Sequence, residues 1–507
     1  MIRVIISICC LLVLSGVQAQ KVNLKKLDKY IENAVEEWGV PGLSVAIVKD
    51  GEIVFEKGYG VKELGEPEKN DEHTLYAIAS NTKAFTSAMV AQLVEEGKLK
   101  WDDPVQKYIS YFEVYDPTVS GMVTIRDLLS HRVGLGTFYG DVTWYRSDFT
   151  SEEIIKNIKH VRQTYPFRSG YGYSNLMFIT AGKVIEEVTG KSWEENVQER
   201  LLDRVGMTRT IASVAKLDSK GNYANPHKWD NGKHRPTPWV SWDNVQATGG
   251  LLSSVHDMGL WIAANLNHGV IKNDTLFSKA SRNQMWKPHT TMTRNHVGKN
   301  DFGNRWAGYG LGWFLGDYQG KYMVRHGGGY DGMISTVNLL PDLDLGVVVL
   351  TNGVKVPTSA IAYYVFDRYL GRAEKDWSSF FKVGSDRFYN GDTRIADLKA
   401  KRVPDTEASF TKNDISGTYI ADGYGEIKVS EENGKLVLDF TRSPDLKATL
   451  SHWHYDTYQI HWEKDQPWFS FGTVQFTADN NHKVKGIEFE VPNDDFFFEE
   501  LNAVKQY

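Results

Sequence analysis

The stretch that organises the chain is Ala77-Ile-Ala-Ser-Asn-Thr-Lys-Ala-Phe-Thr-Ser-Ala-Met-Val-Ala-Gln-Leu-Val-Glu-Glu-Gly97. Its apolar residues recur at spacings of three and four, and Gly97 stands where a helix would end. Ser80 and Lys83 lie three residues apart, so a helix would place the hydroxyl and the amine on one face. This spacing favours a nucleophile that works without a Ser-His-Asp triad, but an N-capping Ser followed by a solvated Lys has the same spacing.

The composition is that of a globular protein with more than one domain. Hydrophobic residues make up 41% of the 507 residues and charged residues 24%, and the chain is too long for one ordinary core. The net charge of −6 has no long charged run behind it. The sequence therefore predicts no nucleic-acid partner, and it leaves the oligomeric state open.

The first 19 residues have the features of a secretory signal peptide. Arg3 supplies the positive start, residues 4–14 the apolar stretch, and Val17-Gln-Ala19 the small-residue cleavage site. The apolar stretch is too short to predict a membrane span. It contains both cysteines, Cys9 and Cys10, so the mature chain would have no disulfide and no thiolate metal site. We expect export, to a periplasm or out of the cell, with lipid anchoring as a minor alternative.

Residues 20–371 have the pattern of an α+β domain. Periodicity predicts a helix over residues 24–38, a hairpin over 42–55, a helix-rich stretch from Ser80 to about 290, strands over 321–350 and a closing helix over 358–370. Within the helix-rich stretch, a capping box at Thr124 and Asp127 predicts a short helix over residues 128–132. Strands at both ends with helices between them predict an antiparallel sheet flanked by helices, together with an all-helical subdomain.

Residues 372–410 are polar, and we interpret them as a linker before a second domain at 411–507. Short aromatic and β-branched segments recur there about every ten residues, which predicts a small antiparallel β-barrel. The predicted strands are 418–420, 425–429, 435–440, 458–462, 469–476, 484–491 and 496–501. His452, His454 and His461 alternate with aromatic residues, a pattern more typical of packed or surface histidines than of a metal site.

Two further stretches carry residue types that acyl transfer needs. Phe167-Arg-Ser-Gly-Tyr-Gly-Tyr-Ser-Asn175 precedes a helical pattern, and Val324-Arg-His-Gly-Gly-Gly-Tyr-Asp-Gly332 follows a strand pattern, with a turn expected at 327–329. Acyl transfer requires a nucleophile, a base and donors for the oxyanion. Tyr173 can supply a phenol or phenolate, Asn175 an amide for a substrate carbonyl, and the glycines a backbone that approaches a ligand closely.

Ser80-Asn-Thr-Lys83, Tyr173-Ser-Asn175 and His326-Gly-Gly328, in this order, resemble the three motifs of the serine β-lactamase and penicillin-binding-protein superfamily. The second motif is similar to that of the class C β-lactamase branch, which includes D,D-carboxypeptidases, D-aminopeptidases and certain esterases. The resemblance covers residues 25–371. The segment from about residue 411 resembles the lipocalin-like domain that is often fused to such hydrolases.

The resemblance implies a role for each motif residue. Ser80 would be the acylated nucleophile, Lys83 would hold the proton network that activates it, and Tyr173 would act as general base. Asn175 would orient the substrate. The oxyanion hole would consist of the backbone N–H groups of Ser80 and Gly329. The resemblance implies no metal and no organic cofactor.

The third motif departs from the family pattern. It usually reads Lys-Thr-Gly, whose Lys and Thr favour the carboxylate of β-lactams and D-Ala-D-Ala peptides. Here the substrate-binding positions are His326 and Gly328, so the hydroxyl is absent and an imidazole that is mostly neutral at pH 7 replaces the cation. We therefore expect weak β-lactam turnover, and esters, amides or D-amino-acid peptides fit better.

The leading hypothesis is an exported serine hydrolase that forms an acyl-enzyme on Ser80 and cleaves amide or ester bonds of small substrates or peptides. The alternative within the enzyme class is a true class C β-lactamase or D,D-carboxypeptidase. Outside that class, the chain could be a non-catalytic penicillin- or glycan-binding protein with the barrel as its working module. The intact Ser80, Lys83 and Tyr173 favour an enzyme.

Overall fold

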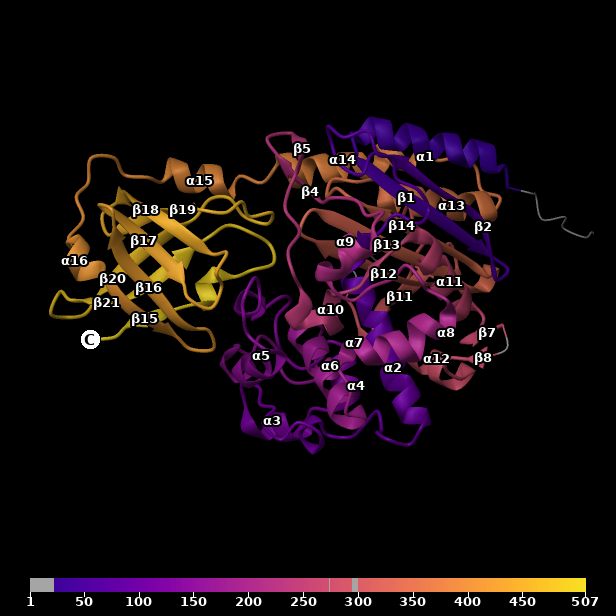
Figure 1. Ribbon diagram of the computed structural model, residues 1–507, viewed down its shortest axis with the longest axis horizontal. Coiled ribbons are helices and arrows are strands. Elements are labelled where there is room, and N and C mark those ends of the chain that lie inside the picture. Colours follow the sequence, from indigo (N-terminus) through magenta and orange to yellow (C-terminus); the bar gives the residue numbers. More distant parts are fainter. Residues whose placement is uncertain (1–21, 273, 294–299) are drawn as a thin grey trace, which may run out of the picture.

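The structure is a computed structural model that describes residues 22–272, 274–293 and 300–507. The predicted signal peptide, residues 1–19, lies outside this part of the chain. Figure 1 shows a larger domain, which contains a sheet and most of the helices, beside a β-barrel formed by the C-terminal residues in orange and yellow. Over the described residues, none of the helices has the length and apolar character needed to cross a membrane.

An eight-stranded antiparallel sheet forms the centre of the larger domain, in the order β2-β1-β14-β13-β12-β11-β10-β9. Its strands are β1 (Gly42–Lys49), β2 (Glu52–Gly60), β9 (Thr290–Thr291), β10 (Ala307–Tyr309), β11 (Phe314–Tyr318), β12 (Lys321–Tyr330), β13 (Met333–Leu340) and β14 (Leu345–Thr351). The first hairpin joins the later strands through β1 and β14, where Val45 lies opposite Val349. The expected sheet with two halves from distant sequence is therefore confirmed.

Helices cover both faces of this sheet, which explains why β1 is buried from Gly42 to Val48. Leu43, Val45 and Ile47 belong to one core with α1 (Leu24–Trp38) and α13 (Thr358–Tyr369). Ala46 and Val48, which point the other way, belong to the core that contains α2 (Thr82–Glu95) and α11 (Val255–Leu266). Because each buried Val or Ile is worth about 1.5–3 kcal/mol, this alternation fixes the register of the strand.

The predicted all-helical subdomain lies between the two halves of the sheet in sequence. Its helices are α3 (Pro117–Met122), α4 (Ile125–Leu129), α5 (Ser151–Asn157), α6 (Asn175–Thr189), α7 (Trp193–Val197), α8 (Asp203–Val205), α9 (Leu217–Lys220), α10 (Gln246–Gly249) and α12 (Lys279–Met285). The helix expected over residues 128–132 is wrong, because α4 ends at Leu129. His131 adopts a φ of +54°, in the left-handed region, and a right-handed helix cannot continue through it.

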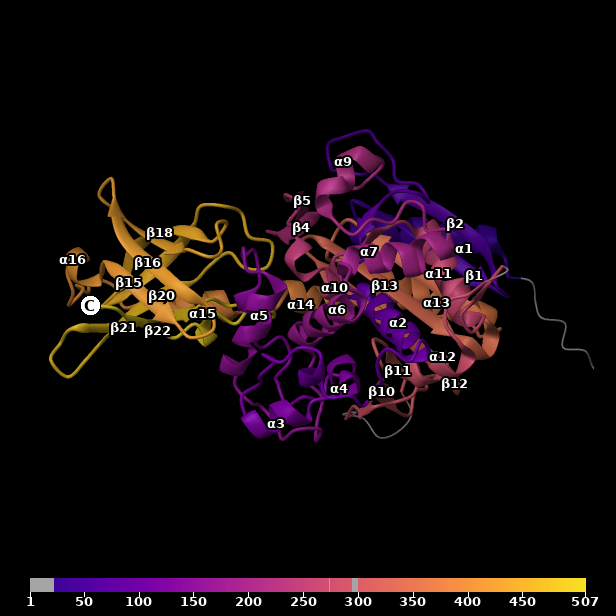
Figure 2. The ribbon, with the colours of Figure 1, turned by 60° about the horizontal axis from the view of Figure 1, so that its bottom comes forward.

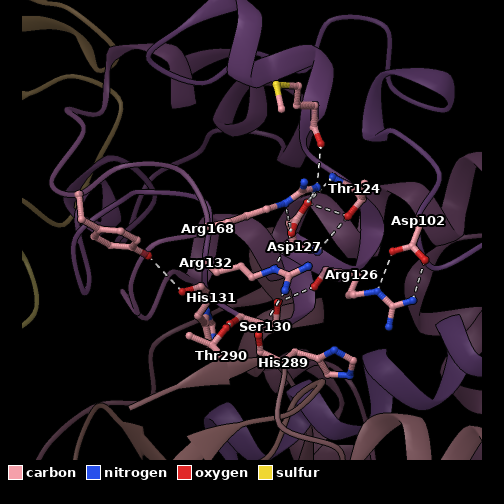
Figure 3. A network of polar contacts seen from close by, with 12 residues as sticks. Asp102, Thr124, Arg126, Asp127, Ser130, His131, Arg132, Arg168, His289 and Thr290 are labelled. Carbon is pink, nitrogen blue, oxygen red and sulfur yellow. Dashed lines mark hydrogen bonds and ion pairs between the residues drawn. The ribbon is translucent and has the colours of Figure 1, made fainter. Parts of the chain in front are cut away.

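A buried carboxylate, Asp127, holds this part of the subdomain together (Figure 3). It accepts hydrogen bonds from Arg132 Nε at 2.6 Å, Arg168 Nη2 at 2.6 Å and Thr124 Oγ1 at 2.7 Å. The backbone N–H of Thr124 also donates to it, which completes the predicted capping box of α4. With a further bond from Arg168 Nε at 3.0 Å, five hydrogen bonds thus compensate for the removal of this carboxylate from water.

The same network connects the subdomain to the edge of the sheet. Arg132 Nη1 donates to the carbonyl of His289, and Thr290 Oγ1, in β9, donates to the carbonyl of Ser130 at 2.6 Å (Figure 3). These bonds fix residues 130–132, which include His131, against the sheet.

Two helices, α14 (Trp377–Asn390) and α15 (Arg394–Ala400), follow α13, and α16 (Lys412–Ile415) precedes the barrel. The barrel is closed and antiparallel. Its strands are β15 (Gly417–Ala421), β16 (Gly425–Glu432), β17 (Lys435–Phe440), β18 (Lys447–His454), β19 (Thr457–Trp462), β20 (Thr473–Ala478), β21 (Val484–Glu490) and β22 (Ala503–Lys505). The architecture is the one predicted, although the strands β18 and β22 were not expected.

The strand predicted at residues 496–501 is wrong. This aromatic segment forms a loop and a 3₁₀ helix, Phe498–Glu500. Phe498 packs into the barrel core, whereas Phe496 stacks on Tyr145 of the larger domain with ring centroids 4.0 Å apart. The aromatic content that suggested a strand therefore reflects side chains directed to two different domains.

The barrel contacts the helical subdomain at the segment that leads into α5. This helix lies on the side of the larger domain that faces the barrel (Figure 2). Arg442 of the barrel pairs with Asp148 and Glu153, and its guanidinium lies 3.9 Å from the ring centroid of Phe149. Glu500 accepts a hydrogen bond from the backbone N–H of Gly140 at 2.8 Å.

Asp127→Ala should destabilise the protein by about 3 kcal/mol, because it leaves two partly buried arginines without their carboxylate. Burial acts to raise the pKa of Asp127, but hydrogen bonds from Arg168 and Thr124 outweigh it, so the pKa lies below its usual value. The contribution of Asp127 to the free energy of unfolding is therefore present above about pH 4, and it is lost as the pH falls through the lowered pKa. Urea unfolding at pH 7 measures the loss.

The matched control is Asp102→Ala, which removes the exposed partner of Arg126 and should cost under about 1 kcal/mol. Equal losses in the two variants would contradict the role assigned to Asp127.

Candidate active site

Ser80 lies in a single turn of 3₁₀ helix, Ala79–Asn81, that leads directly into α2. The preceding residue, Ala79, has a φ of +45°, a conformation that side-chain-bearing residues rarely adopt. Such backbone strain persists only where the surrounding structure enforces it. The buried helix α2 provides part of that support, since Thr82 to Leu93 are all buried.

The third motif lies against this turn, but not as the turn that was expected at residues 327–329. These glycines continue β12, and Gly328 pairs with Ser335 of β13. A Cβ atom on Gly328 would lie 2.2 Å from the carbonyl oxygen of Ile78, so only glycine allows this approach. Ser335 Oγ donates to the same carbonyl at 2.7 Å. The strand and the nucleophile turn are thus locked together.

Lys83 is fully buried and has three partners from separate parts of the chain. Its Nζ lies 3.0 Å from Ser80 Oγ, 2.7 Å from Asn175 Oδ1 and 2.8 Å from the carbonyl oxygen of Thr248. Burial lowers the pKa of Lys83 well below its usual value, and the nearby Asp141 opposes this shift.

This geometry determines which partners the N–H groups and the lone pair of Lys83 face. The oxygens of Asn175 and Thr248 can only accept hydrogen bonds, so they take two N–H groups of the amine in either protonation state. In the neutral amine, the remaining lone pair is directed at the Ser80 hydroxyl. Lys83 is therefore arranged to accept the proton of Ser80.

Tyr173 is buried beside the amine, with Lys83 Nζ 4.9 Å from its ring centroid. Burial raises the pKa of Tyr173, although a hydrogen bond with the Ser80 hydroxyl acts in the opposite direction. The resting side chain is thus a phenol. His131 packs against this ring at 4.3 Å between centroids, and its Nδ1 accepts the Ser174 N–H at 3.0 Å, which supports the position of the second motif.

The sequence analysis missed one acidic residue of this network. Asn175 Nδ2 donates to the buried carboxylate of Asp141 at 2.6 Å, and Trp144 Nε1 donates to its other oxygen at 2.8 Å. Burial raises the pKa of Asp141 to about 8, while these two hydrogen bonds act to lower it. Since Asp141 accepts from the amide NH₂, it fixes the Asn175 oxygen toward Lys83. No local motif surrounds Asp141 that could have revealed this.

His326 is buried and engaged on both sides of its ring. Its Nδ1 lies 2.6 Å from the carbonyl oxygen of Gly327, which can only accept, so its Nε2 accepts from the Tyr309 hydroxyl at 3.0 Å. Burial and the nearby Lys83 lower the pKa of His326 to about 3. The imidazole is therefore neutral at physiological pH, as expected for this departure from Lys-Thr-Gly.

These groups line a cavity of about 540 Å³, to which both domains contribute. The larger domain supplies the predicted residues Ser80, Tyr173, Asn175, His326, Gly328 and Gly329. The barrel supplies Trp468, Asp495 and Phe496, which the sequence analysis did not assign to the site. Across the described ranges, no three His, Cys, Asp or Glu side chains are grouped so as to hold a metal ion.

The fold and this site define a serine hydrolase of the β-lactamase and penicillin-binding-protein superfamily. The chain belongs to the β-lactamase family, because the family model described as Beta-lactamase matches residues 27–369. A second model, described as Domain of unknown function (DUF3471), matches residues 402–505 and thus the barrel.

Individual proteins agree with this assignment. The chain is 29% identical over 371 residues to a protein named unguisins hydrolase from Aspergillus campestris, covering 69% of this chain and 67% of the relative. An octameric penicillin-binding protein homologue from Pyrococcus abyssi has a similar fold, with a TM-score of 0.60 at 23% identity over 95% of this chain and 100% of that one. A D-stereospecific amidohydrolase from Streptomyces aligns with a TM-score of 0.55 at 22% identity, over 69% of this chain and all of that one.

Asp141→Asn tests whether Asp141 orients Asn175. The new amide would place a donor against either the Asn175 NH₂ or the indole N–H, and an Asn175 flip would direct its NH₂ at Lys83. We expect kcat for a p-nitrophenyl ester to fall about 10- to 100-fold, the cost of one misplaced hydrogen bond in a buried network. Unchanged kcat in a variant that folds normally, as judged by circular dichroism, would contradict this role.

Proposed function

We propose that this protein is an exported serine hydrolase that cleaves amide or ester bonds through an acyl-enzyme on Ser80. The observation that carries the proposal is the buried amine of Lys83, which faces the Ser80 hydroxyl while Asn175 and Thr248 occupy its other donors. A structural or merely binding role would not need a desolvated amine next to a hydroxyl, because burying it costs free energy.

The proton path follows from the protonation states. Lys83 takes the proton of Ser80 as the oxygen attacks the substrate carbonyl carbon, and the Tyr173 phenol gives its proton to the departing amine or alkoxide. The Lys83 ammonium then returns a proton to the phenolate. Because burial raises the pKa of Tyr173, its resting side chain carries a proton, so it can donate to a leaving group but cannot act as a resting general base. In deacylation, water replaces the leaving group and the path runs in reverse.

The oxyanion would bind to the backbone N–H groups of Ser80 and Gly329. Two features support this assignment: Gly328 fixes β12 against the Ser80 turn, and Gly329 is the next residue of the strand. A rigid pair of donors stabilises the developing charge without reorganisation.

The substrate is an amide or ester without a strictly recognised carboxylate. The neutral, buried His326 provides no cation at the position where β-lactam-hydrolysing relatives have Lys. The unguisins hydrolase and the D-stereospecific amidohydrolase are named for reactions compatible with this class. We expect a hydrolysis screen to show turnover of p-nitrophenyl esters and aminoacyl amides well above that of nitrocefin.

Ser80→Ala should abolish labelling by a fluorophosphonate probe, because the probe reacts only with an activated serine hydroxyl. The matched control is Ser87→Ala, which changes a buried serine about two turns further along the chain, in α2 and outside the catalytic network. Fluorescence of the labelled band measures the effect. Equal labelling of wild type and Ser80→Ala would exclude Ser80 as the nucleophile.

Tyr173→Phe should lower kcat for anilides by about 100-fold or more, since it removes the proton donor for a poor leaving group. The loss for p-nitrophenyl esters should be smaller, because p-nitrophenolate departs without a proton. Steady-state kinetics on both substrates measures the difference. A loss of the same size for both would indicate that Tyr173 acts before the leaving-group step.

A further inference from the structure

The barrel places one carboxylate in the catalytic cavity, and the proton path described above does not use it. Asp495 lines the cavity together with Ser80 and Tyr173, and its charge influences both Tyr173 and Asp141. Within the part of the chain that the structure describes, no hydrogen bond or ion pair involves the Asp495 carboxylate. Its free oxygens are thus available to a ligand in the cavity.

The loop that carries Asp495 is held in place by its own hydrogen bonds. The Asn493 side chain is buried and accepts from the backbone N–H groups of Asp495 at 3.0 Å and Phe496 at 2.6 Å. Its amide donates to the carbonyls of Val491 and Phe496. Phe496 then stacks on Tyr145, so the carboxylate is positioned before any ligand binds.

The surroundings of Asp495 favour a cationic partner. Trp468 and Phe496 line the same wall, and aromatic faces attract ammonium groups. Trp468 also borders the oxyanion position, since a Cβ atom on Gly329 would lie 3.4 Å from its Cη2. Burial and the carboxylates of Asp494 and Asp331 raise the pKa of Asp495 to about 7, and a cation bound beside this carboxylate would oppose that shift.

We propose that Asp495 is a specificity-determining residue that binds a primary ammonium group of the substrate beside the scissile bond, as in an amide of an amino acid with a free amino group. This inference rests on the proposed function of Ser80 and narrows its substrate class. The aromatic wall of Trp468 and Phe496 packs around the cation, and the barrel thereby selects the substrates on which Ser80 acts.

The test uses two p-nitroanilides of nearly the same shape, alanyl and isobutyryl, which differ by an ammonium group in place of a methyl group. D- and L-alanyl forms are separate arms. In wild type, kcat/KM for the better alanyl anilide should exceed that for the isobutyryl anilide. Asp495→Asn should reduce this ratio about 10- to 100-fold, the usual effect of losing a charged hydrogen bond.

Asp494→Asn is the matched control, because it removes the same charge from an exposed neighbour that pairs with Arg394 outside the cavity. In this variant, the ratio of kcat/KM for the alanyl anilide to that for the isobutyryl anilide should stay within about two-fold of wild type. An unchanged ratio in Asp495→Asn, or an equal fall in Asp494→Asn, would overturn the proposed subsite. Turnover of the isobutyryl anilide that still requires Ser80 would leave the serine-hydrolase function intact in that case.

A binding experiment separates the two proposals if no anilide is hydrolysed. In a Ser80→Ala background, alaninamide should bind at least ten-fold more tightly than isobutyramide by calorimetry, and Asp495→Asn should remove this preference. Equal binding of the two amides would overturn the ammonium subsite, whereas selective binding without any Ser80-dependent turnover would overturn only the catalytic proposal.

Discussion

The buried amine of Lys83 is the constraint on which the active site depends. An amine removed from water must find a partner for each N–H, and here the partners come from Ser80, Asn175 and Thr248. The Ser80 turn, the start of α6 and the end of α10 must therefore meet at one point. Since α2 is buried nearly all round, any displacement of these segments would expose the amine or leave it unpaired.

The sheet fixes the position of the Ser80 turn because Gly328, in β12, has no side chain. Because Gly328 lacks a Cβ atom, β12 approaches Ile78 closely enough to fix the turn that carries Ser80. The same strand buries His326, whose hydrogen bonds and low pKa leave this position uncharged. The tight packing that positions Ser80 thus also keeps the His326 imidazole neutral, and Arg325 of the same strand is the cation that lines the cavity.

The sequence predicted the parts of the molecule whose signals are local. The helix at residues 24–38 and the first hairpin required only periodicity and turn residues, whereas the three motifs were identified by their resemblance to the superfamily. It did not reveal Asp141, whose role arises from contact with Asn175 across the fold, or Thr248, which contributes a backbone carbonyl that any residue possesses. The segment that contains Phe496 was misread because its aromatic side chains pack in two domains, so the loop that enters the cavity looked like a strand.

The two domains contribute different groups to the cavity. Ser80, Lys83 and Tyr173 all belong to the larger domain, while Trp468, Asp495 and Phe496 of the cavity wall come from the barrel. Asp331, fully buried after β12, joins the two, because it accepts from Tyr145 and Trp242 of the larger domain and from Trp468 of the barrel. A carboxylate with three fixed donors tolerates little displacement. The barrel wall is therefore held rigidly over the cavity, and Trp468 belongs both to this wall and to the hydrogen bonds that hold it in place.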